Sequence, residues 1–178
     1  MKKIILLFVI GLISLNTFSQ KLVTKTDEFT GVKTTETKVE KLISKGMIAS
    51  SVLKYSFLKL NDTIYFNARM ELNGGKTVFA IGKDFRIIFI LEDKTKITIK
   101  SKDHIVSKQG GARDGFYGSA LYGVKSKYYF ENEEDIQKLK NTLIKKARVY
   151  TDEGYFEKNV KAKAGINFKE NLNLILSK

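Results

Sequence analysis

The sequence predicts an α+β protein: a mainly antiparallel β-sheet or open barrel of about seven to nine strands, with one or two C-terminal helices packed on it. Apolar and polar residues alternate through much of residues 21–101, a period of two that a helix cannot satisfy. After residue 131 the period changes, and apolar residues recur three and four apart. Short turns separate the strand-like segments, so neighbouring strands must run antiparallel.

The first nineteen residues predict where the protein works. Lys2 and Lys3 give a positive start, an apolar run follows, and Thr17 and Ser19 place small side chains before a cut at Gln20. This is the layout of a secretory signal peptide. The apolar run spans about 18 Å as a helix, well short of the roughly 30 Å hydrocarbon core of a membrane. We therefore expect cleavage rather than a retained membrane anchor.

This divides the chain into a signal peptide, 1–19, and a single α+β domain, 20–178, which is long enough to bury a substantial core. We expect an exported protein, periplasmic or extracellular, that is soluble and no longer an integral membrane protein after cleavage. The strong preference for lysine over arginine resembles the usage of AT-rich bacterial genomes. The chain has no cysteine, so a disulfide, a catalytic thiol and a bacterial lipoprotein anchor are all excluded.

The strand section begins with Lys33–Val39, which is rich in β-branched residues and follows a Thr30–Gly31 turn. Val52–Leu60 carries apolar residues on both faces, as expected for a strand that is covered on two sides. An Asn61–Asp62 turn leads into the clearest alternation of the chain, residues 63–72. There one face presents Ile64, Phe66, Ala68, Met70 and Leu72, and the other presents Thr63, Tyr65, Asn67, Arg69 and Glu71.

The middle of the chain continues the strand pattern. Asn73–Lys76, with sequence NGGK, predicts a hairpin turn that leads into a strand over Thr77–Ile81. Ile87–Leu91 is a short apolar run typical of a central strand. Glu92–Lys94 then turns the chain into Thr95–Lys100. A further aromatic strand is expected over residues 124–130.

A helix is predicted to begin after Asn132, which can cap it, with acidic residues 133–135 in its first turn. Ile136, Leu139 and Leu143 form its apolar face, and bases at positions 145, 146 and 148 suit its far end.

The last thirty residues predict a short hairpin followed by a helix. Arg148–Thr151 and Tyr155–Glu157 are expected to pair across the turn between them. A second helix is expected from about Phe168 onward. Residues 158–167 fit a strand or a helix equally, and the choice stays open.

Residues 109–123, QGGARDGFYGSALYG, combine five glycines with aromatic residues and an arginine. Glycine lets a backbone approach a ligand closely, and binding loops often carry aromatic and arginine side chains. The segment has no phosphate-binding glycine motif. We therefore predict a ligand-binding role for Arg113, Phe116, Tyr117 and Tyr122, which should line one concave surface. The alternative is a long surface connection.

The sequence offers little for catalysis or metal binding. His104 is the single histidine, no GxSxG turn is present, and a zinc site commonly needs several histidine or cysteine ligands. The acidic residues 131–135 lack a calcium-loop pattern and suit a helix N-terminus. We expect no catalytic residue, no metal and no cofactor.

The positive net charge of the chain limits the kinds of binding partner that we expect. The formal charge of +13 falls to +11 after cleavage, because Lys2 and Lys3 leave with the signal peptide. The lysines are interspersed with acids and the chain has four arginines, so we do not expect nucleic acid as a partner. An anionic envelope polymer or another exported protein fits better. In addition, Asp62–Thr63–Ile64 resembles the O-glycosylation triplet of some Gram-negative exported proteins, which makes Thr63 a candidate acceptor.

Taken from the sequence alone, the function is that of an exported, non-enzymatic binding or interaction module. Two alternatives stay open. One is a hydrolase of cell-envelope or extracellular polymer, which would need His104 or two carboxylates in a cleft. The other is a basic protein that associates with anionic cell-surface polymers through charge alone.

Overall fold

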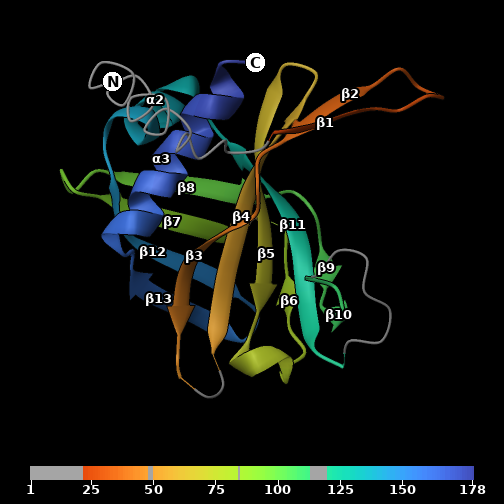
Figure 1. Ribbon diagram of the computed structural model, residues 1–178. Coiled ribbons are helices and arrows are strands. Elements are labelled where there is room, and N and C mark those ends of the chain that lie inside the picture. The colour runs from red at the N-terminus through yellow and green to blue at the C-terminus, as the bar shows by residue number, and fades with distance from the viewer. Residues whose placement is uncertain (1–21, 48–49, 84, 113–119) are drawn as a thin grey trace, which may run out of the picture.

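A computed structural model of the chain describes residues 22–47, 50–83, 85–112 and 120–178. These residues form the predicted α+β structure, a large antiparallel sheet with two α-helices (Figure 1). The elements are β1 (Val23–Thr26), β2 (Lys33–Glu36), β3 (Glu40–Lys45), β4 (Ser51–Leu60), β5 (Thr63–Glu71), the 3-10 helix η2 (Asn73–Gly75), β6 (Ala80–Ile81), β7 (Arg86–Leu91), β8 (Lys96–Ser101), β9 (Ile105–Val106), β10 (Lys108–Gln109), β11 (Tyr122–Phe130), α2 (Glu133–Asn141), β12 (Ile144–Thr151), β13 (Gly154–Asn159) and α3 (Ala162–Leu176).

The main sheet has the order β1-β2-β4-β5-β11-β8-β7-β12-β13, with β3 added beside β4 and β10 beside β11. β6 and β9 form a separate two-stranded sheet, and every pairing is antiparallel, as the short turns predict. The sheet curls strongly, so that β13 comes to lie next to β3. One face of the curled sheet is therefore turned inward and the other outward.

The inward face is filled by aliphatic and aromatic side chains. Helix α3 packs over this face (Figure 1). Phe168 of α3 has its ring centroid 5.0–6.1 Å from those of Tyr55, Phe57, Phe66 and Phe89, which come from three strands. These ring contacts join α3 to β4, β5 and β7. Phe168, together with Leu172 and Ile175 of the same helix, therefore packs α3 into the core.

The alternation predicted for residues 63–72 is confirmed. Phe66, Ala68 and Met70 of β5 are fully buried, whereas Tyr65 and Asn67 are only half-buried on the other face. β4 also follows the prediction, because Leu53, Tyr55 and Phe57 are fully buried and Leu58 on its other face is nearly so. The same inside–outside alternation continues through β7, β8 and β12.

The hairpin predicted at Asn73–Lys76 is wrong. Asn73, Gly74 and Gly75 all have positive φ (48°, 69° and 79°) and form η2, which carries the chain away from the sheet. A two-residue hairpin turn would have returned it alongside β5. Instead β5 pairs with β11, and the strand that follows, β6, pairs with β9.

The first helix begins as predicted and ends earlier. The Asn132 side chain accepts a 2.9 Å hydrogen bond from the Asp135 backbone N–H, which is an N-cap. The helix stops at Asn141, since Thr142 is extended, and the predicted last-turn residues 145, 146 and 148 belong instead to β12. The hairpin predicted there is confirmed as β12–β13.

Three further details depart from the predictions or complete them. The described residues hold thirteen strands rather than seven to nine, partly because β6, β9 and β10 are two-residue strands. β13 ends at Asn159 and α3 starts at Ala162, which resolves residues 158–167 and places the second helix earlier than Phe168. No helix among the described residues has the length and apolar character needed to cross a membrane.

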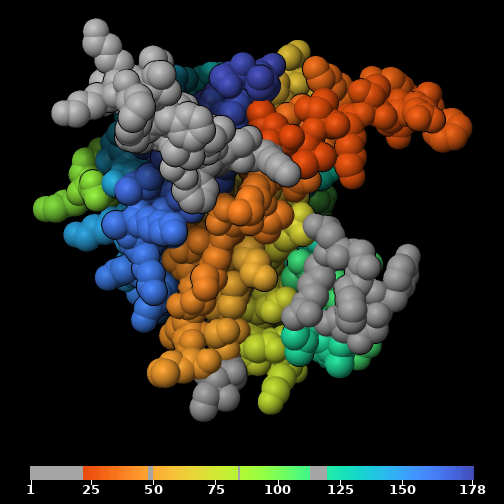
Figure 2. Space-filling model, in the orientation of Figure 1, coloured from red at the N-terminus to blue at the C-terminus, as the bar shows by residue number. Residues whose placement is uncertain are grey.

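The β1–β2 hairpin extends outward from the rest of the molecule (Figure 2). Phe29, in the turn between its strands, is 99% exposed, and every residue of β1 is exposed. β2 attaches the hairpin to β4 through the pairs Thr34–Leu60, Thr35–Lys59 and Glu36–Leu58.

Candidate functional site

Six tyrosine and cationic side chains form one row across the outward face of the sheet. Tyr129 of β11 pairs with Tyr65 of β5 on one side and with Lys100 of β8 on the other. Lys100 in turn pairs with Arg86 of β7. The Arg86 guanidinium lies over the ring of Tyr150 on β12, 5.0 Å from its centroid. We call this set the tyrosine–cation row: Tyr65, Tyr129, Lys100, Arg86, Tyr150 and, paired with Tyr150 on β13, Tyr155.

Strand geometry places these side chains outside the core. In each strand a residue next to the row member is buried: Phe66, Tyr128, Ile99, Ile87, Val149 and Phe156. Successive side chains of a strand point to opposite faces, so all six members of the row point outward. The row crosses six strands, which at about 4.8 Å per strand gives a length of roughly 24 Å along the sheet.

One half of the row is a pair of tyrosines with lysines over their rings. The Tyr65 and Tyr129 rings meet edge to face, with centroids 4.9 Å apart. Lys102 Nζ lies 4.6 Å from the Tyr129 centroid and Lys127 Nζ lies 5.9 Å from that of Tyr65. Such cation–π contacts orient the rings and keep positive charge beside them. This half therefore presents aromatic and cationic groups together.

The other half is organised by Arg148 of β12. Its guanidinium carbon lies 4.4 Å from the Tyr155 centroid and 6.0 Å from that of Tyr150. It also donates a 3.2 Å hydrogen bond to the Tyr150 hydroxyl, and this bond holds the pKa of Tyr150 below its ordinary value. Two guanidinium groups, those of Arg86 and Arg148, therefore lie within about 6 Å of the Tyr150 ring centre.

Glu157 of β13 provides an internal anion beside this half. Its carboxylate accepts hydrogen bonds from Lys146 Nζ at 2.5 Å and from Arg148 Nε at 2.6 Å, and these bonds lower its pKa. A hollow of about 150 Å³ adjoins the pair, with Ile88 and Ile90 in its lining. Arg148 therefore already binds one carboxylate, that of Glu157, through two nitrogens of its guanidinium.

Most of the ligand-binding residues predicted from the sequence lie outside the described part of the chain. Arg113, Phe116 and Tyr117 belong to residues 113–119, and their role stays a prediction. Tyr122 begins β11, is half-buried and pairs with Gln109 of β10. Thr63, the predicted glycosylation acceptor, is exposed at the start of β5, and its modification is likewise a prediction.

Two glycines of the glycine-rich segment 109–123 are required by close packing of the backbone. A Cβ atom on Gly111 would lie 2.2 Å from the carbonyl oxygen of Gly123, and one on Gly123 would lie 2.6 Å from the Cβ of Ala112. Both distances are shorter than any real contact, so only glycine fits. Here the close approach is between two stretches of backbone.

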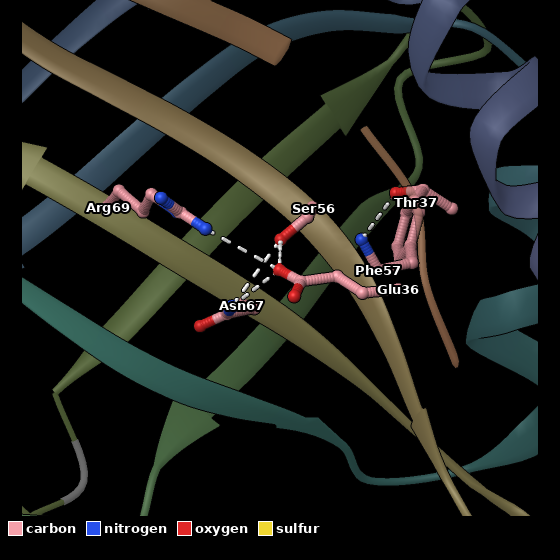
Figure 3. A network of polar contacts seen from close by, with 6 residues as sticks. All are labelled: Glu36, Thr37, Ser56, Phe57, Asn67 and Arg69. Carbon is pink, nitrogen blue, oxygen red and sulfur yellow. Dashed lines mark hydrogen bonds and ion pairs between the residues drawn. The ribbon is translucent and has the colours of Figure 1, made fainter. Parts of the chain in front are cut away.

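The single histidine, which a hydrolase was expected to use, lies at the surface. His104 is exposed in the connection between β8 and β9. Ser56 of β4 donates a 2.5 Å hydrogen bond to Glu36 Oε1, but it is fully buried, so a substrate does not reach its hydroxyl group (Figure 3). Among the described residues, no group of three or more histidine, aspartate or glutamate side chains is placed to hold a metal ion.

The sequence alone does not reveal the tyrosine–cation row, although some of its members stand at strand positions that alternation predicts to face outward. The alternation of residues 63–72 already placed Tyr65 on the outward face, and the predicted hairpin contained Tyr155. The missing information was register, because only the pairing of Tyr129 with both Tyr65 and Lys100 aligns the six strands. Comparison of the chain with protein-family models, curated proteins and solved structures finds no match.

Proposed function

We propose that this protein is an exported, non-enzymatic binding module that holds an extended acidic polysaccharide along the tyrosine–cation row. The observation that carries the proposal is the register that aligns Tyr65, Tyr129, Lys100, Arg86, Tyr150 and Tyr155 across six strands. A linear ligand can follow such a row, whereas a small molecule would contact only part of it.

The two kinds of side chain in the row match the two kinds of surface on an acidic sugar chain. A sugar ring presents a flat face of C–H groups, which packs on an aromatic ring such as that of Tyr155, 55% exposed. Its carboxylate, sulfate or phosphate groups pair with guanidinium and ammonium groups, which Arg86 and Lys102 supply at exposed positions. Charge complementarity thus favours an acidic polysaccharide over a neutral one.

The Arg148–Glu157 contact supports carboxylate as one of the anions bound. The arginine already forms two close contacts with a carboxylate, 2.5 and 2.6 Å from NH2 and Nε to the same Glu157 oxygen. A sugar carboxylate reaching the neighbouring Arg86 would meet a guanidinium that lies over Tyr150. The row therefore offers an acidic sugar a cation and a ring at the same position.

The test is a calorimetric titration of residues 20–178 with a polyuronate, compared with neutral dextran. We expect saturable binding of the polyuronate and none of dextran. Arg86→Gln should weaken polyuronate binding by at least about threefold. Lys158→Gln is the matched control, because it removes one charge from an exposed residue of β13 outside the row. Equal losses in both variants would mean attraction by net charge alone and would refute the proposed row.

Salt separates stacking from charge. Attraction between exposed charges weakens strongly with ionic strength, whereas ring stacking does not. We expect part of the polyuronate binding to persist at about 0.5 M salt and to be lost in Tyr155→Ala. Phe29→Ala serves as the control, because Phe29 is also an exposed aromatic residue and lies on the β1–β2 hairpin. Preferential binding of a nucleic acid of equal charge would contradict the choice of polysaccharide.

A further inference from the structure

A second hollow, of about 320 Å³, opens at the Tyr155 end of the tyrosine–cation row. Tyr155 of β13 belongs to the row and also lines this hollow. The rest of the lining comes from the end of the β3–β4 hairpin, from η2 and the segment after it, and from the β12–β13 hairpin. These segments meet because the sheet curls until β13 lies next to β3 (Figure 1). The volume lies within the range of small-molecule sites.

Asn73 of η2 holds two hydroxyl groups of this lining in place. Its backbone N–H donates a 3.3 Å hydrogen bond to Ser51 Oγ, and its side-chain Nδ2 donates a 2.8 Å hydrogen bond to Thr77 Oγ1. A hydroxyl group that accepts one hydrogen bond keeps its own proton to donate. Ser51 and Thr77 can therefore each donate to a ligand oxygen from a fixed position.

The charges that line the hollow are balanced, in contrast to those of the row. Lys45 and Glu153 are both exposed and bring one positive and one negative charge. Leu72 and Phe156 are apolar and buried, and Tyr155 supplies an exposed ring. A small anion would meet Glu153 as well as Lys45, and an apolar ligand would leave the hydroxyl groups without partners. A sugar suits the whole lining, because its hydroxyl groups both donate and accept and its C–H face packs on a ring.

We infer that this hollow holds the terminal sugar of the acidic polysaccharide, so that the protein binds a chain end rather than an internal stretch. The inference rests on the proposed function, because the row leads the sugar chain to Tyr155. The row stops there, since β13 is the last strand of the main sheet. A terminal sugar has one more free hydroxyl group than an internal sugar, and the hollow offers Ser51, Thr77 and Asn73 to bind it.

The test follows the amide signals of residues 20–178 during titration with galacturonate and with hexagalacturonate. We expect both ligands to shift the signals of Asn73, Thr77 and Tyr155 saturably. Hexagalacturonate should bind at least about tenfold more tightly, because it also contacts the row. Two modified hexamers identify the end: one has an unsaturated sugar at its non-reducing end, and the other carries 2-aminobenzamide at its reducing end. One modification should weaken binding by at least about tenfold, and the other should leave it unchanged.

Two matched variants test the contacts. Asn73→Gly removes the side-chain amide without straining the backbone, because glycine readily adopts its φ of 48°. We expect it to weaken hexagalacturonate binding by at least about fivefold. Asn61→Gly is the control, since Asn61 also has a positive φ (53°), is exposed in the β4–β5 turn and lines neither the row nor the hollow. Thr77→Val removes the hydroxyl group but keeps the shape, and it should give a similar loss even if Asn73→Gly fails to fold.

The outcomes separate the hollow from the row. Shifts at Tyr65 and Tyr129 without shifts at Asn73 and Thr77 would overturn the inference and leave the row standing. Equal affinities for galacturonate and hexagalacturonate would mean a site for free sugar and would also overturn it, as would binding that neither end modification changes. A hexagalacturonate that does not bind at all would refute both the row and the terminal site.

Discussion

The guanidinium carbon of Arg148 lies 4.4 Å from the centre of the Tyr155 ring. Tyr155 is paired with Tyr150, two residues beyond Arg148, so this contact runs diagonally across the β12–β13 ladder. Arg148 also donates a hydrogen bond to the Tyr150 hydroxyl and approaches Glu157 through two nitrogens. One cation thus fixes both tyrosines at this end of the row.

The contacts of Glu157 make stability depend on pH in a defined direction. Hydrogen bonds from Lys146 and Arg148 lower the pKa of Glu157 in the folded state. A carboxyl group with a lowered folded pKa stabilises the protein above its unfolded pKa, and that stabilisation is lost as pH falls through the folded value. We expect Glu157→Gln to lower the free energy of unfolding at pH 7, with the difference from wild type shrinking below about pH 4.5.

Urea denaturation of the wild type and of Glu157→Gln, at pH 7 and at acidic pH, measures this difference in the free energy of unfolding. Asp62→Asn is a suitable control, because Asp62 is exposed in the β4–β5 turn and belongs to neither β12 nor β13. A difference between Glu157→Gln and wild type that stays constant across this pH range would show that the carboxylate is not stabilised by its partners.

Phe168 is one of the buried residues that attach α3 to the core. Its ring contacts Tyr55, Phe57, Phe66 and Phe89, and it is 1% exposed. Phe168→Ala should therefore lower the free energy of unfolding by about 3–5 kcal/mol. Ile166→Ala in the same helix removes a side chain that is 46% exposed and should cost much less. Guanidinium unfolding curves give the free energy of unfolding of both variants. Similar decreases in the two would show that Phe168 is not part of the core.

The close approach of the backbone at Gly111 and Gly123 predicts that alanine is destabilising at Gly111 but tolerated at a glycine with open surroundings, such as Gly165. Gly111→Ala would place a Cβ 2.2 Å from a carbonyl oxygen and should destabilise the protein by at least about 2 kcal/mol. Gly165→Ala, in the first turn of α3, would meet its nearest atom at 3.5 Å, an ordinary contact. There alanine should stabilise by up to about 1 kcal/mol, because it favours a helix. Thermal denaturation measures both variants. A higher melting temperature for Gly111→Ala than for Gly165→Ala would contradict the close backbone contact between Gly111 and Gly123.

The N-cap of α2 can be tested on its own. Asn132→Ala removes the acceptor of the Asp135 backbone N–H and should cost about 1 kcal/mol of unfolding free energy. Asn141→Ala, at the exposed end of the same helix, should leave stability unchanged or slightly raised. Denaturation midpoints distinguish them, and an unaffected Asn132→Ala would mean that the cap contributes nothing.

The sequence predicts correctly those features that depend on neighbouring residues, and it fails where distant strands pair. The β5 alternation and the Asn132 cap are properties of a few neighbouring residues, and both were predicted correctly. Leu143 fits the apolar face of α2 by spacing, yet the chain is extended from Thr142 and Ile144 enters β12, where it pairs with Leu91. Long-range pairing therefore decided between a longer helix and a strand.

The same limit applies to the functional site. A tyrosine at an outward strand position, such as Tyr65, is visible from alternation alone, but its neighbour Tyr129 lies more than sixty residues away in sequence. Likewise, nothing local indicates that Arg69 is buried, with its guanidinium 3.6 Å from Glu36 of β2. Sites built across strands become visible only once the register is known.

The most direct test of the tyrosine–cation row follows both of its ends in one experiment. Residues 20–178, with tyrosine rings isotopically labelled, are titrated with a uronic acid oligosaccharide long enough to span about 24 Å. We predict that the ring signals of Tyr65 and Tyr129 and those of Tyr150 and Tyr155 shift together, with a single dissociation constant. Shifts confined to one end, or to residues off the row, would contradict the account.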